Sequence, residues 1–255
     1  MKLKSLNSHI RDSRVSLDEE AHTYYIDGNP YDLSVTSFIN EFFEVFNEDD
    51  VIKKNYDKWQ INKHPIYFEL KPNEIKEMWE KNRKKAAELG SILHNDIELF
   101  YNNINPKNNS TEFNFFLNFH ERINRKLIPF RTEWQIFDEE HKIAGSIDMV
   151  YLNNDKSIVL CDWKRSKKIE KENKFQAGKP PINHLQDTNY WHYSLQLNIY
   201  KYIIEKNYSL DVSNLILVFL HPNQLNYILI KVPDLMNEVE KMLTLRKLNL
   251  SKYPY

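Results

Sequence analysis

The chain has 255 residues, of which 41% are hydrophobic, so it is long enough for one large domain or two small ones. The 35 lysines and arginines nearly balance 36 aspartates and glutamates, and a net charge of −1 does not by itself indicate a nucleic-acid-binding protein. The 4 glycines argue against a glycine-rich phosphate loop, and a single cysteine excludes a disulfide framework within the chain. No apolar run has membrane-spanning length and no secretory signal is visible, so we expect an intracellular protein, in the cytoplasm or a DNA-containing compartment, without a membrane partner.

The first part of the chain predicts short strands followed by helices. Residues 15–33 are typical of a β-hairpin that turns at Asp27-Gly28, and the segment 34–37 offers capping residues for a helix. Hydrophobic periodicity and breaker residues predict the remaining elements. These are helices over 48–62, 73–101 and 113–127, a loop over 102–111, a lysine-rich connection over 165–183, a helix over 186–206, strands over 215–220 and 227–232, and a helix over 233–248.

The segment 144–168 predicts two strands joined by the polar turn 153–156. Side chains alternate along a strand, so Asp162 and Lys164 share one face and the residue between them occupies the other. If the turn is centred on Asp155, Asp148 lies opposite Asp162, because the two aspartates are equally far from Asp155 in the sequence. Opposed carboxylates destabilise a sheet unless a cation lies between them, which predicts a metal site. A turn centred one residue away would remove this pairing.

The strands of this region are apolar on both faces, which is typical of a sheet covered by helices on both sides and predicts an α/β fold. The strand that follows Pro129 is expected beside the central hairpin. We expect a single domain over 1–255, in which residues 1–85 form an N-terminal hairpin and helical region and residues 86–255 form a catalytic core.

Several polar residues around the hairpin suggest chemistry. His94 and Glu98 are four residues apart and share a helix face. With Asp148 and Asp162 they would offer an imidazole and carboxylates to Mg²⁺ or Mn²⁺, so Glu98 is a candidate ligand too. Lys164 would hold its ammonium group beside the cation and offset negative charge on a phosphate oxygen.

Gln196 and Tyr200, also four residues apart, would add hydrogen bonds to the same cavity. Ordinary structural interpretations stay open. A lone histidine is most often a surface or satisfied core residue, Glu98 fits a solvated helix charge, and Tyr200 fits a core aromatic residue. Glu133 fits either a further member of the site or an outward-facing strand residue, and we favour the outward position.

Four motifs occur along the chain in a set order. Their order and approximate spacing resemble the RecB-like branch of the PD-(D/E)xK nucleases, and within it the mitochondrial genome maintenance exonuclease type and related phage and viral exonucleases. The similarity covers residues 86–206, and more loosely the preceding hairpin. A single D-x-K triplet is common, whereas four ordered motifs are specific. The motifs are Leu89-Gly90-Ser91-x-x-His94, Gly145-x-x-Asp148, Asp162-Trp163-Lys164 and Gln196-x-x-x-Tyr200.

The resemblance implies a metal-dependent DNA phosphodiesterase with a restriction-endonuclease-like core, a central mixed sheet flanked by helices. It implies Mg²⁺ or Mn²⁺ as the cofactor. Several RecB-like relatives carry four cysteines for an iron–sulfur cluster, which Cys161 alone cannot hold, so none is expected. The implied metal ligands are His94, Asp148, Asp162 and the Trp163 backbone carbonyl, and the implied catalytic residues are Lys164, Asp148, Asp162, Gln196 and Tyr200.

DNA contacts are expected from two basic stretches, one just before His94 and one leaving the strand of Lys164. Such runs are usually solvated loops, but their attachment to the site favours phosphate binding. Two aromatic residues in a polar segment are candidates for stacking on unpaired bases. The residues expected to bind DNA are Lys84, Lys85, Arg165, Lys167, Lys168, Tyr190 and Trp191.

The expected function is a metal-dependent exonuclease that hydrolyses phosphodiester bonds in single-stranded DNA or at DNA ends. Two alternatives stay open. One is an endonuclease of restriction or flap-cutting type. The other is a catalytically idle DNA-binding module that recruits a helicase or polymerase, against which the intact Asp148, Asp162 and Lys164 argue.

Overall fold

The structure is a computed structural model that describes residues 2–31 and 33–252. Residues 1, 32 and 253–255 belong to the expected domain, and residue 32 to the expected hairpin, but they lie outside the described residues. Contacts divide the chain into two compact units, Met1–Glu44 with Leu93–Tyr255, and Val45–Ile92. The expected single domain with a division after residue 85 stays a prediction.

The larger unit begins with short elements and a small antiparallel sheet. The turn between β2 (Thr23–Ile26) and β3 (Asn29–Tyr31) contains Asp27 and Gly28 at φ 51° and 79°, a pair of positive values typical of a two-residue hairpin turn. The predicted hairpin is therefore confirmed, and the sheet has a third strand. Ser34 caps the next helix, because its hydroxyl accepts a hydrogen bond from the Ser37 backbone N–H at 3.0 Å. The elements are α1 (Lys2–Leu6), a 3-10 helix (Ile10–Arg14), β1 (Val15–Asp18), β2 (Thr23–Ile26), β3 (Asn29–Tyr31) and α2 (Val35–Asn40).

The larger unit is built around a five-stranded mixed sheet with the strand order β4-β5-β6-β7-β8. Neighbouring strands are antiparallel except β6 and β7, which are parallel and are joined through α6. The strands and helices predicted for this part of the chain are confirmed with boundary shifts of a few residues. They are α5 (Thr111–Ile123), β4 (Ile128–Asp138), β5 (Ile143–Leu152), β6 (Ile158–Lys164), α6 (Asn189–Asn207), β7 (Val212–Phe219), β8 (Ile228–Lys231) and α7 (Met236–Lys252).

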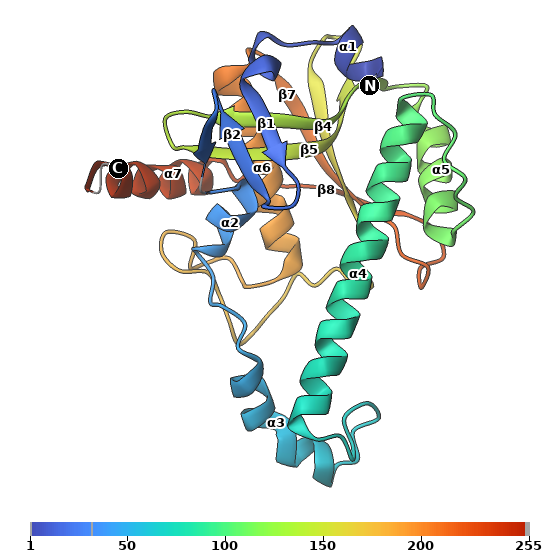
Figure 1. Cartoon of the computed structure of the whole chain (residues 1–255), viewed down its shortest axis with the longest axis vertical. Coiled ribbons are helices and arrows are strands. Elements are labelled where there is room, and N and C mark those ends of the chain that lie inside the picture. Colours follow the sequence, from blue (N-terminus) through green and yellow to red (C-terminus); the bar gives the residue numbers. More distant parts are fainter. Residues whose placement is uncertain (1, 32, 253–255) are drawn as a thin grey trace. The chain divides into compact units, whose positions relative to one another are not determined.

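Helices cover both faces of this sheet (Figure 1). On one face, Trp134 and Leu160 belong to a core shared with α2, α6 and α7. On the other face, Met149 and Trp163 belong to a core shared with α5 and the last turns of α4 (Pro72–Tyr101). The fold is thus a mixed α/β structure, as the two-sided apolar strands predict. No helix within the described residues has the length and apolar character needed to cross a membrane.

The smaller unit contains α3 (Glu48–Ile61) and the first part of α4, which confirms the helices predicted over 48–62 and 73–101. Its core is a group of aromatic rings. The centroid of Tyr67 lies 4.4 Å from that of Trp59 and 6.0 Å from that of Trp79. The indole Nε1–H of Trp79 also donates to the Tyr67 hydroxyl at 3.2 Å. These contacts give the two helices an apolar seam between them.

A buried ionic network closes the β4–β5 hairpin. Asp138, which is 1% exposed, accepts hydrogen bonds from His141 Nδ1, from Lys206 Nζ at 3.2 Å and from Asn207 Nδ2 at 3.1 Å. Burial alone would raise the pKa of Asp138, but these hydrogen bonds and the nearby positive charges outweigh it and lower the pKa to about 2.

We expect the Asp138→Asn variant to lose about 2 kcal/mol of unfolding free energy at neutral pH. The pKa of Asp138 is lower in the folded chain than its ordinary value of 3.8, so its contribution is complete above pH 3.8 and is lost as the pH falls through about 2. Urea unfolding of both proteins at a series of pH values between 7 and 2 measures this gap. A gap that stays constant over the series would contradict the expectation.

Candidate active site

The β5–β6 hairpin has the predicted register. Residues pair from Leu152↔Ile158 at the turn to Met149↔Cys161, which corresponds to a turn centred on Asp155. The next residues in this register are Asp148 and Asp162. At this point the Asp148 carboxylate, through Oδ2, accepts a hydrogen bond of 2.8 Å from the backbone N–H of Trp163. The two aspartates therefore lie at the same end of adjacent strands, with Asp148 bound to the backbone of β6.

Three possible metal ligands converge at this end of the sheet. Ligand atoms of His94, Glu133 and Asp148 all lie within 4.8 Å of one another. His94, on α4, donates from Nε2 to the Trp163 carbonyl at 2.9 Å. Its Nδ1 lies 3.5 Å from Asp148 Oδ2 and 4.0 Å from Glu133 Oε1. In the neutral ring Nδ1 then carries a lone pair, so three electron-pair donors face one another, which suits a cation.

Glu133 comes from the neighbouring strand β4. Thr132 pairs with Met149 and Trp134 with Ile147, so Glu133 lies opposite Asp148. Its backbone has φ 42°, a left-handed conformation that costs about 1–3 kcal/mol for a residue other than glycine. Burial, followed by the negative charges of Asp148 and Glu98, raises the pKa of Glu133.

The outward position favoured for Glu133 is therefore wrong, because its side chain belongs to the carboxylate group. The sequence carried a usable signal. The polar segment 139–142 forms the β4–β5 turn, and counting back from its midpoint, between Glu140 and His141, places Glu133 opposite Asp148. The unusual backbone conformation, which lets the side chain join the group, has no such signal in the sequence.

Asp162, which is buried, and Lys164, which is half-buried, form an ion pair on β6. Lys164 Nζ donates to Asp162 Oδ1 at 3.0 Å and lies 2.8 Å from Oδ2, which is buried without a hydrogen bond among the described residues. Burial raises the pKa of Asp162, and the negative charge of Asp148 adds to the effect. Burial would lower the pKa of Lys164, but the charges of Asp162 and Asp148 outweigh it and raise it. Lys164 therefore keeps its proton.

Gln196 and Tyr200 continue a hydrogen-bonded chain from this pair. Gln196 Oε1 accepts from Lys164 Nζ at 3.4 Å, and Gln196 Nε2 donates to the Tyr200 hydroxyl at 3.0 Å. The ring of Tyr193 lies under the ammonium group, 4.5 Å from Nζ to the ring centroid. These contacts from α6 add to the ion pair with Asp162 in fixing the position of Lys164.

Gly145 is required by the position of Tyr200. A Cβ atom at Gly145 would lie 2.6 Å from Cε1 and 3.0 Å from the hydroxyl oxygen of Tyr200, closer than real side chains pack. Gly90, in the interior of α4, differs in that a Cβ atom there would meet nothing within 4 Å. The two glycines of the sequence motifs therefore have different structural roles.

We expect Gly145→Ala to lower the unfolding free energy by about 1–3 kcal/mol, because the added methyl group displaces a buried ring. Gly90→Ala is the matched control and is expected to raise stability by about 0.5–1 kcal/mol, as alanine does in an open helix interior. Urea unfolding of both variants measures the contrast. Equal effects of the two substitutions would show that the Tyr200 contact does not constrain the site.

Tyr24 is a further neighbour of the carboxylates that the sequence did not indicate. It lies on β2 in the N-terminal sheet and is 8% exposed. Burial raises the pKa of Tyr24 to about 12, with contributions from the negative charges of Glu133 and Asp148. The N-terminal sheet thus supplies a neutral phenol to one side of the site.

Glu98 lies outside the three-residue group. Its carboxylate accepts a long hydrogen bond of 3.5 Å from the Thr132 hydroxyl, and burial raises its pKa. The negative charge of Glu98 contributes to raising the pKa of Glu133, but Glu98 is not a member of the three-residue group. Its assignment as a ligand stays a prediction.

The residues expected to bind DNA lie in different surroundings. Arg165 is held by Glu112, with 2.7 Å between Nη2 and Oε1, so its guanidinium group already has a carboxylate partner. Tyr190 is only 6% exposed, so the expectation of a free stacking surface there is wrong. Trp191 donates from Nε1 to the Lys171 carbonyl at 3.2 Å. The exposed members of the set are Lys167 and Lys168 in the larger unit and Lys84 and Lys85 on α4 in the smaller unit.

Comparisons with known proteins leave the family of the chain open. No protein-family model matches the sequence, and no curated protein matches it. Among solved structures, the chain is similar to a "Putative exonuclease" from Eubacterium rectale, at 12% identity and a TM-score of 0.39, over 64% of this chain and 65% of that one. It is also similar to the protein SSO0001, at 15% identity and a TM-score of 0.34, over 98% of this chain and 82% of that one.

The chain thus spans slightly less than two thirds of the length of the first of these structures. Both TM-scores are below 0.5, so these similarities are too weak to carry a shared fold or activity. What the chain does has to follow from the chemistry of its own residues.

Proposed function

We propose that the chain is a Mg²⁺- or Mn²⁺-dependent deoxyribonuclease of the RecB-like PD-(D/E)xK type, acting as an exonuclease on single-stranded DNA or DNA ends. One observation carries the proposal. A group of three ligand side chains, His94, Glu133 and Asp148, lies at the strand ends beside the half-buried Lys164, whose Nζ is 3.0 Å from Asp162 Oδ1. Cation ligands next to a fixed ammonium group are the elements that phosphodiester hydrolysis requires.

The residues fit a divalent cation. Ligand atoms of His94, Glu133 and Asp148 converge within 4.8 Å, and Asp162, whose Oδ2 is buried and lies 2.8 Å from Lys164 Nζ, adds a carboxylate from the adjacent strand. Carboxylates with one imidazole suit Mg²⁺ or Mn²⁺, and the imidazole favours Mn²⁺. These four residues would hold the cation. When bound, it would supply Lewis acidity that activates water and offsets phosphate charge.

Neighbouring side chains fix the position of the Lys164 ammonium group. Asp162 and Gln196 hold Lys164 Nζ from two sides, at 3.0 Å and 3.4 Å, and Tyr193 lies beneath it. An ammonium group fixed in this way needs no reorganisation as negative charge grows on a phosphate oxygen. Tyr200 holds Gln196 in turn, so Gln196 and Tyr200 act as positioning residues for Lys164.

Exposed lysines near the site favour a polyanionic substrate. Lys167 and Lys168 lie shortly after the end of β6 at Lys164 and are exposed. Burial, followed by the positive charges of Arg165 and Lys167, lowers the pKa of His221, although the negative charge of Glu112 raises it. A DNA backbone would be attracted to this edge of the sheet, and a helicase or polymerase would be a natural supplier of such strands.

Linear and circular substrates test the mode of cleavage. We expect end-labelled linear single strands to be degraded with Mn²⁺, and a covalently closed single-stranded circle of the same sequence to stay intact. Cutting of the circle would instead indicate an endonuclease of the same fold. DNA binding that persists in chelator, without cutting in any metal, would indicate a DNA-binding module and contradict the nuclease.

A further inference from the structure

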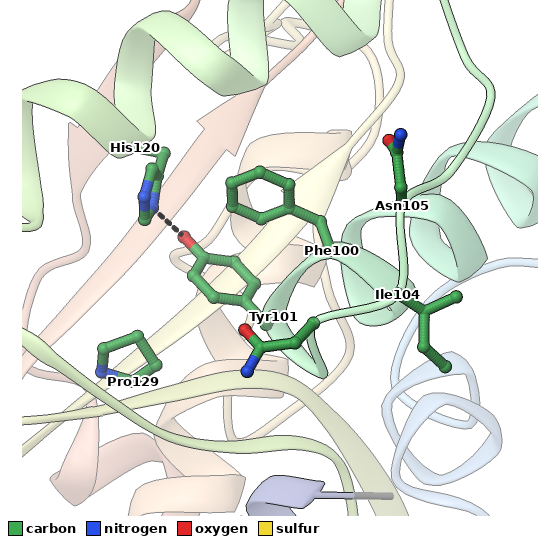
Figure 2. A pocket seen from close by; sticks show the side chains of 7 residues that line it. Phe100, Tyr101, Ile104, Asn105, His120 and Pro129 are labelled. Atoms are coloured by element: carbon green, nitrogen blue, oxygen red, sulfur yellow. Dashed lines mark hydrogen bonds between the residues drawn. The ribbon is translucent and has the colours of Figure 1, made fainter.

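A second pocket lies outside the candidate active site and shares no residue with it. It has a volume of about 420 Å³, within the range of about 300–1,000 Å³ typical of small-molecule sites. It forms where the C-terminal end of α4, the following loop, α5 and the start of β4 meet. Figure 2 shows the rings of Phe100, Tyr101 and His120 grouped together, with Asn105 and Ile104 on another side. Its lining residues are Phe100, Tyr101, Asn103, Ile104, Asn105, His120 and Pro129.

A chain of hydrogen bonds determines the tautomer of His120. Tyr151 is fully buried, and the hydroxyl of Tyr101 is 2.7 Å from its own. A buried hydroxyl hydrogen needs an acceptor, so Tyr151 donates to Tyr101. Tyr101 then donates to Nδ1 of His120 at 3.2 Å (Figure 2). The ring proton of neutral His120 is therefore on Nε2, which has no partner among the described residues.

Two further features keep this pocket uncharged and ready to donate hydrogen bonds. Burial lowers the pKa of His120, so the imidazole is neutral at pH 7. None of the other lining residues carries a charge either. The exposed amides of Asn103 and Asn105 add donors and acceptors beside the aromatic ring of Phe100.

The rim of the pocket is held rigidly. α4 ends at Tyr101. Asn103, two residues later, has φ 62° and its N–H donates to Phe100 O at 3.1 Å, while the N–H of Ile104 donates to Leu99 O at 2.9 Å. This pair of hydrogen bonds is a Schellman motif, which fixes the chain that follows the helix. Asn102 adds an anchor, since its side chain donates to the Thr132 hydroxyl at 3.1 Å. The pocket is therefore formed before any ligand binds.

We propose that this pocket binds an uncharged nucleobase. Phosphate or carboxylate ligands would find no cation in the lining, and a purely apolar ligand would leave the Nε2–H of His120 and the asparagine amides unpaired. A planar base with adjacent carbonyl and N–H groups satisfies both kinds of group and packs against Phe100. The base can come from a free nucleoside or from an unpaired DNA strand, and the strand source rests on the proposed function.

The position of the pocket suits a strand that reaches the active site. Tyr101 is seven residues from His94 on the same helix, which corresponds to about 10 Å. A base bound at this distance would belong to a nucleotide near the one being cleaved. The pocket would then hold the strand by an unpaired base, independently of the phosphate contacts.

The test uses the full chain in chelator, so that no cleavage takes place. Calorimetric titration with each of the four deoxynucleosides is expected to show saturable binding of at least one. Asn105→Trp, which fills the pocket opening, is expected to abolish it, and Asn154→Trp on the exposed β5–β6 turn is the matched control with unchanged binding. His120→Phe, which keeps a ring but removes the donor, is expected to weaken binding about tenfold.

A second titration distinguishes the two sources. Oligonucleotides with one abasic position, moved along the strand, are expected to lose affinity at one position, and Asn105→Trp is expected to remove this dependence. Nucleoside binding without a position effect would identify a free nucleoside as the ligand. No response in either titration, or responses that persist in Asn105→Trp, would overturn the proposal. Because no cleavage is measured, a failure of the proposed nuclease activity leaves the nucleoside result standing.

Discussion

Lys164→Ala is expected to reduce the rate of DNA cleavage by about 10²–10³-fold, while most of the DNA affinity is retained. The reason is geometric. Lys164 is fixed by Asp162, Gln196 and Tyr193, so its charge is aimed at one place, whereas phosphate binding also draws on exposed lysines elsewhere. The measurement is single-turnover cleavage of end-labelled oligonucleotides with Mn²⁺, together with DNA binding in chelator.

Loss of activity through unfolding has to be separated from loss of chemistry. Removing Lys164 leaves the buried Asp162 without its partner, and breaking such a pair costs about 3–5 kcal/mol. Lys164→Gln keeps a donor for Asp162 but has no charge, so it is expected to stay folded and still lose activity. Lys156→Ala, at an exposed lysine of the β5–β6 turn, is the control for the loss of a lysine that no proposed role involves. Turnover like that of the wild type in Lys164→Gln would rule out the assigned role.

Glu133→Gln is expected to lower the affinity for Mn²⁺ by at least about 10–100-fold, since even supporting residues of metal sites have effects of this size. Glu133 and Asp148 approach from adjacent strands, and the imidazole Nδ1 of His94 faces both. Replacing one carboxylate by an amide removes a negative charge and a strong oxygen ligand from the group. Calorimetric titration with Mn²⁺ in the absence of DNA measures the effect without depending on activity.

Glu98→Gln is the matched control, with the same substitution at a carboxylate that lies outside the three-residue group. We expect it to change the Mn²⁺ affinity much less, because Glu98 acts on Glu133 only through its charge. If Glu98→Gln weakened Mn²⁺ binding more than Glu133→Gln, the cation would belong between α4 and the Thr132 region instead. Equal affinities in all three proteins would exclude the site.

Local sequence patterns predicted the parts of the fold that depend on neighbours in the chain. A four-residue polar turn and the alternation of strand side chains were enough for the β5–β6 register, because both are short-range properties. Two-sided apolar strands predicted a sheet covered on both faces for the same reason. The N-cap at Ser34 and the turn at Asp27-Gly28 are further examples.

Features that depend on residues far apart in the chain could not be predicted from local sequence patterns. Arg165 looks like a free basic residue, but its partner Glu112 is 53 positions away. The burial of Tyr190 depends on how the connection after β6 folds, and that segment has no periodic pattern. Gly145 is explained only by the ring of Tyr200 above it. The inward position of Glu133 depends on a left-handed backbone conformation, which a glutamate in the sequence does not predict.

The backbone groups of Trp163 orient two of the proposed cation ligands before a cation binds. The backbone N–H of Trp163 is held by Asp148, and its carbonyl by His94, so one residue ties two of the four proposed ligands to β6. Their rotamers are therefore ordered when the protein folds, and cation binding adds little loss of side-chain entropy. Affinity is then set by the exchange of water for protein oxygen and nitrogen atoms. The same bonds make the end of β6 sensitive to either side chain, so a change at His94 or Asp148 loosens the strand that carries Lys164.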